Sequence, residues 1–115
     1  LTSSNITLAS TAGDVNVANT GIINASGTAT VEAFASFSVA GTITAGSVVL
    51  TSGDDIVTSD ITGTLTAPNG TFLTSTNGGI GIDANNRFIT NSTNLLLRAG
   101  GGDVFVQNLS TAGVN

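Results

Sequence analysis

Three aspartates form the only dense group of carboxylates in the sequence: Asp54, Asp55 and Asp60. Paired carboxylates carry acid–base chemistry in many enzymes that cleave polysaccharides, so a carbohydrate-active protein is one interpretation of this group. The chain has no His, Cys, Lys or Tyr, which removes the usual bases for a Ser or Thr nucleophile. Because Asp54 and Asp55 follow Gly53 in a stretch typical of a turn, we expect solvated turn residues, no catalytic residues and no enzyme.

A glycine-rich segment at residues 78–83 reads GGIGID, like the start of the nonapeptide repeat that binds calcium. That site needs tandem nine-residue copies, whereas this sequence has one, and Ala84 stands where a large apolar residue belongs. The glycines fit turns that require positive φ. Asp14 and Asp103 also follow glycines, and their side chains can cap nearby backbone N–H groups. We expect no metal site and no cofactor.

Polar residues also recur at intervals that suit a stacked surface. If the chain forms stacked coils, Asn24, Thr44, Thr66 and Thr90 lie on one outer face. Flat Thr arrays contact ice in several antifreeze β-helices, so ice binding is an alternative function. Such arrays usually present two Thr columns, but the neighbouring column here is regular only at Thr42 and Thr64, with Ile22 and Phe88 at its ends. Thr is also a good solvated strand residue, and this explanation is preferred.

These residues are positioned by an internal sequence repeat, which is clearest in two of its copies. Residues 5–19 read NITLASTAGDVNVAN and residues 94–108 read NLLLRAGGGDVFVQN. The two copies align over their whole length without an insertion or deletion. Each describes a strand, a Gly-Asp turn and a second strand. Three looser copies lie between them, so the five copies are 4–27, 28–47, 48–70, 71–93 and 94–115. A repeat of this period, with strands too short to bury a face alone, is typical of a solenoid.

The fold class expected is all-β: a right-handed parallel β-helix of about five coils, with three short strands in each coil. The whole chain, residues 1–115, then forms one domain. The alternation of apolar residues predicts which columns point inward. The predicted core columns are Leu8, Val31, Leu50, Leu73 and Leu97; Val15, Phe37, Ile56, Ile80 and Val104; Val17, Val39, Ile82 and Val106; and Ile23, Ile43, Leu65 and Ile89. At residues 110–113 the pattern of the third strand is missing, so we expect that the fifth copy has either lost this strand or is cut short.

The same register predicts an outward column on the first strand of each copy: Thr7, Thr30, Val49, Phe72 and Leu96. Its last three members are apolar, and three neighbouring coils therefore expose large side chains in a row. These side chains either lie over a bend in the surface or form a stripe for lateral contacts. Both interpretations remain open at this point.

Composition narrows the classes of partner. The net charge is -5, and a nucleic-acid partner is not expected because phosphate binding needs a basic face. No apolar run approaches the roughly 18 residues of a spanning helix, so no membrane span is expected. The absence of cysteine excludes a disulfide scaffold. The Asn-x-Ser/Thr sequons follow largely from the Ser and Thr content and carry weight only in a eukaryote: Asn5, Asn24, Asn69, Asn91 and Asn108.

The repeats resemble those of filamentous haemagglutinin-type exoproteins, the β-helical bacterial adhesins exported by two-partner secretion. The matching pieces are NITLASTAGDVNV, GTITAGSVVLTSGDDI, GTLTAPNGTF, TSTNGGIGI and NLLLRAGGGDVFV, and they cover nearly the whole chain. The resemblance implies a right-handed β-helix, export to the bacterial cell surface, and roles in adhesion, biofilm or contact with other cells. It is specific for architecture and leaves the binding partner open.

The expected function is therefore that of a structural or adhesive module in a secreted bacterial surface protein or extracellular filament. A stack of coils forms a rigid rod, and its outward columns offer repetitive surfaces to cell-surface or matrix carbohydrate or protein. Neither end of the sequence contains a helix, a Pro-rich plug or a charge cluster that would block strand pairing. We expect the ends to pair with flanking coils of a longer solenoid or with further copies of the chain.

Overall fold

The computed structural model describes residues 2–58 and 63–109. These residues form fourteen short strands and no helix, and the strands follow one another around the same three sides of a coil. In chain order they are β1 (Thr2–Ser3), β2 (Ile6–Ser10), β3 (Val15–Val17), β4 (Ile22–Ala25), β5 (Thr28–Ala33), β6 (Phe37–Val39), β7 (Thr42–Thr44), β8 (Ser47–Ser52), β9 (Ile56–Thr58), β10 (Thr64–Thr66), β11 (Gly70–Ser75), β12 (Phe88–Asn91), β13 (Leu95–Ala99) and β14 (Val106–Asn108).

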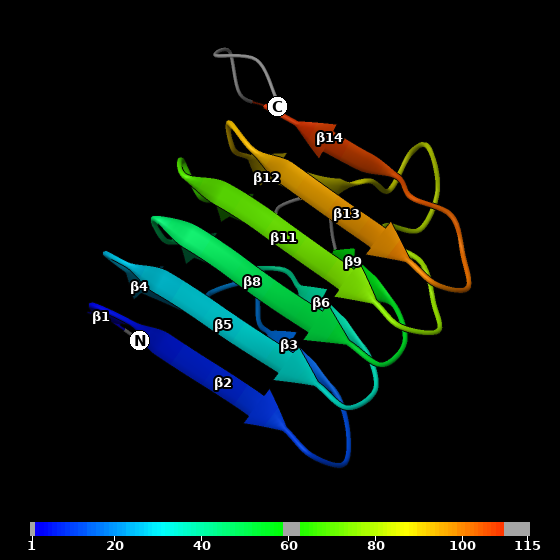
Figure 1. Cartoon of the computed structure of the whole chain (residues 1–115), viewed down its shortest axis with the longest axis horizontal. Helices are drawn as coiled ribbons and strands as arrows, with labels where there is room; N and C mark the ends of the chain where they lie inside the picture. The colour runs from blue at the N-terminus through cyan, green and yellow to red at the C-terminus, as the bar shows by residue number, and fades with distance from the viewer. Residues whose placement is uncertain (1, 59–62, 110–115) are drawn as a thin grey trace.

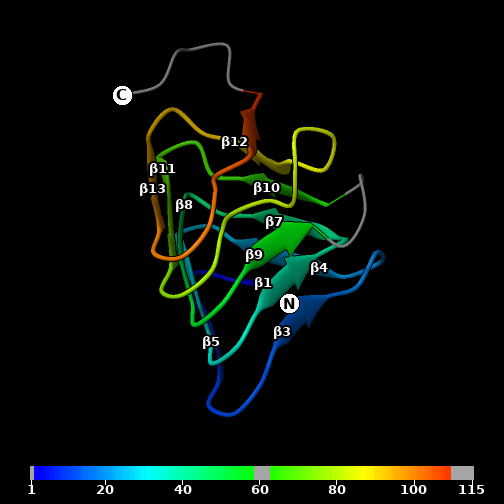
Figure 2. The ribbon, with the colours of Figure 1, turned by 90° about the vertical axis from the view of Figure 1, so that its right-hand side faces the viewer.

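Corresponding strands of successive coils pair in parallel and build three sheets. The first side is a five-stranded sheet, β2-β5-β8-β11-β13, and the third side is a six-stranded sheet, β1-β4-β7-β10-β12-β14. The second side is a three-stranded sheet, β3-β6-β9, which single parallel bridges extend from Ile56 to Ile80 and from Ile80 to Val104. Figure 2 shows the five-stranded sheet edge-on beside the three-stranded sheet. The expected parallel β-helix is confirmed.

The handedness of the coil can be followed in Figure 1. The near, five-stranded sheet runs from left to right while successive coils climb from bottom to top, which is the sense of a right-handed coil. This agrees with the rule that parallel strands joined by a crossover connect with right-handed turns.

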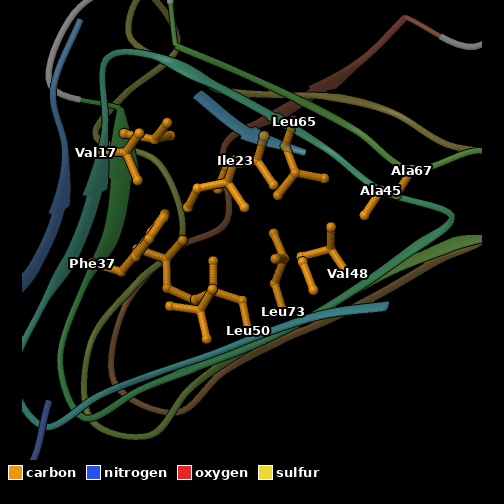
Figure 3. Close-up of a cluster of buried hydrophobic side chains, with 14 of the residues drawn as sticks. Val17, Ile23, Phe37, Ala45, Val48, Leu50, Leu65, Ala67 and Leu73 are labelled. Carbon is orange, nitrogen blue, oxygen red and sulfur yellow. The ribbon is translucent and has the colours of Figure 1, made fainter. Parts of the chain in front are cut away.

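The first side of the coil has the register that the alternation of apolar residues predicted. Leu8 pairs with Val31, and the column continues through Leu50 and Leu73 to Leu97. Its three central members are completely or almost completely buried, whereas Leu8 and Leu97 are half-buried because they belong to the end coils. Figure 3 shows Leu50 and Leu73 pointing into the interior, toward side chains from the other two sides.

The second side follows the prediction for three coils and then departs from it. Val15, Phe37 and Ile56 pair in register, and Val17 pairs with Val39. The predicted core positions Ile82 and Val104 are wrong, since these side chains are 53% and 42% exposed. Gly81, with φ +81°, turns the chain out of the coil after Ile80, so that the N–H of Ile82 donates to the carbonyl of Asn86 in a projecting loop.

The third side contains two further corrections. Leu65 pairs with Thr90, one residue beyond the predicted partner Ile89, so Phe88 and Thr90 point inward and Ile89 is only half-buried. Phe88 supplies more apolar surface to the core than Ile89 would, and the Thr90 hydroxyl finds a partner in Oδ1 of Asn108 at 3.0 Å.

The fifth copy also closes earlier than the sequence predicted. Its third strand is β14, formed by Val106–Asn108, which pairs with β12. Val106 therefore belongs to the third side of the coil and not to the second. Residues 110–113, where the sequence predicted a lost or shortened third strand, lie outside the described residues. Among the described residues, the fifth coil joins the second side through a single bridge at Val104.

Candidate functional site

The carboxylates that could do acid–base chemistry lie in the turn between β8 and β9. Oδ1 of Asp55 accepts a hydrogen bond from the backbone N–H of Gly79 in the next coil, at 2.9 Å. Asp54 is exposed, and Asp60 lies outside the described residues. Within residues 2–58 and 63–109 there is no group of three or more His, Cys, Asp or Glu placed to hold a metal ion. The geometry gives Asp55 a structural role, that of capping a neighbouring coil.

The glycine-rich segment builds a loop whose carboxylate is also used by the backbone. Oδ1 of Asp83 accepts the N–H groups of Asn85 and Asn86 at 2.7 and 2.9 Å, and the Asn86 carboxamide donates to the same carboxylate. Hydrogen bonds lower the pKa of Asp83: the largest effect comes from the N–H of Asn85, and smaller ones come from the side chain and N–H of Asn86. These bonds close a tight turn on an exposed loop.

A surface depression of about 340 Å³ lies beside this loop. Its lining includes Thr58, Asn86, Arg87 and Gln107, with Arg87 as the single ionisable residue. The described lining residues include no carboxylate that could form an acid–base pair with this guanidinium. The depression therefore resembles an ordinary hollow at the base of a loop.

The Thr face is shorter than the sequence predicted. Thr42 and Thr44 pair with Thr64 and Thr66 in adjacent coils, which gives two columns of two residues. On one side these columns meet Ile22 and Asn24. On the other side Thr66 pairs with Asn91, while Thr90 is buried inside the coil, so the prediction of an outward Thr90 is wrong. An array confined to two coils does not favour ice binding.

The outward apolar column lies where the sequence placed it, on the five-stranded sheet. Val49 pairs with Phe72 and Phe72 with Leu96, and these side chains are 38%, 37% and 45% exposed. The Phe72 ring lies over Gly70, where a Cβ atom would come within 3.0 Å of two ring carbons. The glycine thus gives the ring a place to lie along the sheet, and the stripe of Val49, Phe72 and Leu96 stays a candidate lateral contact.

The clearest functional feature is the pair of edges that the described solenoid presents, one at each end. β2 and β13 are the edge strands of the five-stranded sheet, and β1 and β14 are those of the six-stranded sheet. Each edge strand pairs on one side only within the part of the chain that the structure describes. The core is also less well covered there: Leu8 and Val15 at one end, and Leu97 and Val106 at the other, are only partly buried against the core. Unpaired edges next to apolar surface are templates for further strands.

Two side chains show how one coil secures the next. Oδ1 of Asn5 accepts the N–H of Thr28, one coil further on, at 2.9 Å. Asn108 bonds both backbone groups of Ser92, accepting its N–H and donating to its carbonyl. Two of the five sequon asparagines are therefore engaged in holding coils together. The sequence suggested that Asp14 and Asp103 cap nearby backbone N–H groups. It did not reveal that such caps reach between coils, because the bonded partners lie 16 to 24 residues away.

The comparisons with known proteins leave the architecture as the basis for function. The sequence matches no family model, and no curated protein and no solved structure is significantly similar to it. The described part of the chain has no helix long and apolar enough to cross a membrane.

Proposed function

We propose that the chain is a module of a rigid β-helical rod, whose two open ends pair with further coils. The observation that carries this proposal is the combination of unpaired edge strands and partly covered core at both ends of the described solenoid. A further coil placed on β13 would continue the parallel ladder and cover Leu97 and Ala99. The driving force is the same hydrophobic burial and backbone pairing that join β11 to β13 inside the chain.

The coil that docks there comes from the same polypeptide or from a second copy. Five coils at about 4.8 Å each would give an axial repeat of roughly 24 Å per copy. In such a stack β14 of one copy takes the place beside β4 of the next copy that β1 occupies within a single chain, because the third side has six strands and the first side has five, so β1 is displaced at the junction. Head-to-tail contacts of this kind add each copy along one straight axis and do not close into a ring, so they generate rods or fibres.

In its biological setting we place this rod in a secreted bacterial surface protein or an extracellular filament. The support is the resemblance of the repeats to filamentous haemagglutinin-type exoproteins. The outward columns, including the stripe of Val49, Phe72 and Leu96, offer repeated contacts to cell-surface or matrix carbohydrate or protein. Adhesion would then depend on a stiff spacer that presents such columns in a fixed order.

The test compares two lysine substitutions on the same edge strand. Leu97 points into the core and Leu96, its neighbour in β13, points outward. Leu97→Lys places a charge where the next coil would pack, and inward-pointing charges block edge pairing. Leu96→Lys adds the same charge to the outer face. We expect sedimentation and electron microscopy at high protein concentration to show rods for the parent and for Leu96→Lys, and loss of rods for Leu97→Lys.

As a control, thermal melts followed by circular dichroism test whether the coils of both variants are folded. Equal association of the two lysine variants, or an 11.3 kDa monomer at every concentration of the parent, would contradict stacking of this chain on itself.

A further inference from the structure

One column of the solenoid alternates between acidic and small residues. It consists of the residues that directly precede the second-side column Val15, Phe37, Ile56, Ile80 and Val104, which pair coil by coil. In chain order these preceding residues are Asp14, Ser36, Asp55, Gly79 and Asp103. An aspartate therefore stands in the first, third and fifth coils, and no two aspartates of this column occupy adjacent coils.

Two aspartates of the column, Asp14 and Asp55, each cap the coil that follows them. Oδ1 of Asp14 accepts the N–H of Ser36, and Oδ1 of Asp55 accepts the N–H of Gly79, both at 2.9 Å. The two bonds have the same direction, toward the C-terminal end. In both bonds the donor is the backbone N–H of a small uncharged residue, Ser or Gly, which adds no negative charge beside the carboxylate.

The alternation has a physical reason. Equivalent residues of adjacent coils are about 4.8 Å apart, so two aspartates in succession would place like charges next to each other. Like charges directly opposite one another on paired strands destabilise the pairing. An aspartate next to a Ser or Gly avoids this repulsion and keeps the charge-assisted hydrogen bond to the backbone.

Among the described residues, no further coil stacks on Asp103 in this column. Its backbone carbonyl accepts the N–H of Ile80 at 2.9 Å, which holds its main chain in the ladder. Its side chain is exposed, and the carboxylate accepts no hydrogen bond from residues 2–58 or 63–109. At this position Asp14 and Asp55 each hold an N–H of the next coil.

We propose that Asp103 selects the coil that docks on the C-terminal end of the solenoid. It caps the backbone N–H of an incoming coil that carries Ser or Gly in this column, and it disfavours the first coil of a second copy, which carries Asp14. This inference rests on the proposed end-to-end stacking and states which neighbour that stacking prefers.

The other charged residues near such a junction do not offset the pair of aspartates. Arg98, on β13, stands in register with Thr74, Thr51, Glu32 and Ala9 on the outer face of the five-stranded sheet. A second copy would therefore bring the uncharged Ala9 next to Arg98. Among the described residues, Asp103 and Asp14 are the carboxylates that a head-to-tail junction makes adjacent.

The experiment measures, by sedimentation in low-salt buffer at neutral pH, the self-association of the parent chain and of three single-substitution variants. Asp14→Asn and Asp103→Asn remove the repulsion and keep an Oδ1 acceptor. Asp54→Asn is the matched control, because it removes one charge from an exposed turn in the middle coil. Two unit charges about 5 Å apart at a wet surface correspond to a change of about fivefold in the dissociation constant. We expect each junction variant to associate about fivefold more tightly than Asp54→Asn, with a smaller difference in high salt.

The double variant Asp14→Asn/Asp103→Asn distinguishes a specific pair from a general loss of charge. If the two residues meet, removing the second charge adds little to the effect of removing the first, so the two effects are not additive. Junction variants that associate like Asp54→Asn, or effects that simply add, would overturn the inference. In that case continued sensitivity to Leu97→Lys would still support end-to-end stacking, whereas no association of any protein, the double variant included, would contradict both proposals.

Discussion

Leu50 shows how a single residue serves the fold. It lies in the third coil and its side chain is completely buried. In the same column, Val31 lies in the coil before it and Leu73 in the coil after it. Its neighbour Val49 belongs to the same strand but points outward and is 38% exposed. Two adjacent residues of similar chemistry therefore have opposite environments, because successive side chains of a strand alternate between its faces.

We expect Leu50→Asp to unfold the chain and Val49→Asp to leave it folded. The first change buries a carboxylate among apolar side chains from all three sides of the coil, and such substitutions cost more than about 4 kcal/mol. The second places the same charge in water and should cost less than about 1 kcal/mol. Thermal unfolding followed by circular dichroism measures both. Similar melting temperatures for the two variants would show that the register of β8 is wrong.

At the scale of elements, the connection after Ile80 departs most from the repeat. Gly81 has the only positive φ among the described glycines, and a Cβ atom there would collide with the carbonyl oxygen of Phe105. The N–H groups of Phe105 and Gly81 donate to the carbonyls of Ile80 and Ile56, so three coils meet at this turn. The element is possible because glycine allows both the backbone conformation and the close approach.

Gly81→Ala should therefore destabilise the fourth and fifth coils by about 1–3 kcal/mol, the usual cost of forcing a side chain into such a conformation. Gly13→Ala is the matched control, because a Cβ atom there would meet nothing closer than Oγ of Ser10 at 4.0 Å. That substitution should be neutral or stabilise the fold slightly, through the unfolded state. Urea unfolding of the two variants decides the point, and equal losses of stability would refute the special role of Gly81.

At the scale of the whole molecule, the solenoid is a one-dimensional stack in which each coil contacts only its neighbours. Leu73 and Leu97 occupy the same column and the same kind of strand, yet Leu73 is completely buried and Leu97 is half-buried. The difference arises because β11 has coils on both sides, whereas β13 has one on a single side among the described strands.

Leu73→Ala should accordingly cost about 3 kcal/mol or more, and Leu97→Ala only about 1 kcal/mol, in dilute solution where the chain is monomeric. At concentrations that favour stacking, the cost of Leu97→Ala should rise toward that of Leu73→Ala, because the next coil buries residue 97. Denaturant unfolding at several protein concentrations tests this expectation. A cost for Leu97→Ala that does not change with concentration, in a sample that forms rods, would mean that the rods do not join at β13.

The repeat by itself determined the main features of this protein. Apolar residues at alternate positions, recurring every 19–24 residues, predicted parallel strands, three sides to a coil and the register of the five-stranded sheet. The inward column through Leu50 and the outward stripe at Val49, Phe72 and Leu96 were found in the same way. These predictions succeed because burial on a strand has a period of two, and a shift of one residue would expose the whole inward set.

Only the tertiary structure decided the features that depend on what lies one coil away. Ile89 and Phe88 are both apolar, so periodicity could not choose between them, and the fit of Phe88 in the core with the bond from Thr90 to Asn108 set the register. The exit of the chain at Gly81 and the early third strand at β14 also follow from contacts with neighbouring coils. The same holds for the caps made by Asp14 and Asp55, because their N–H partners lie 22 and 24 residues further on and become neighbours only when the coils stack.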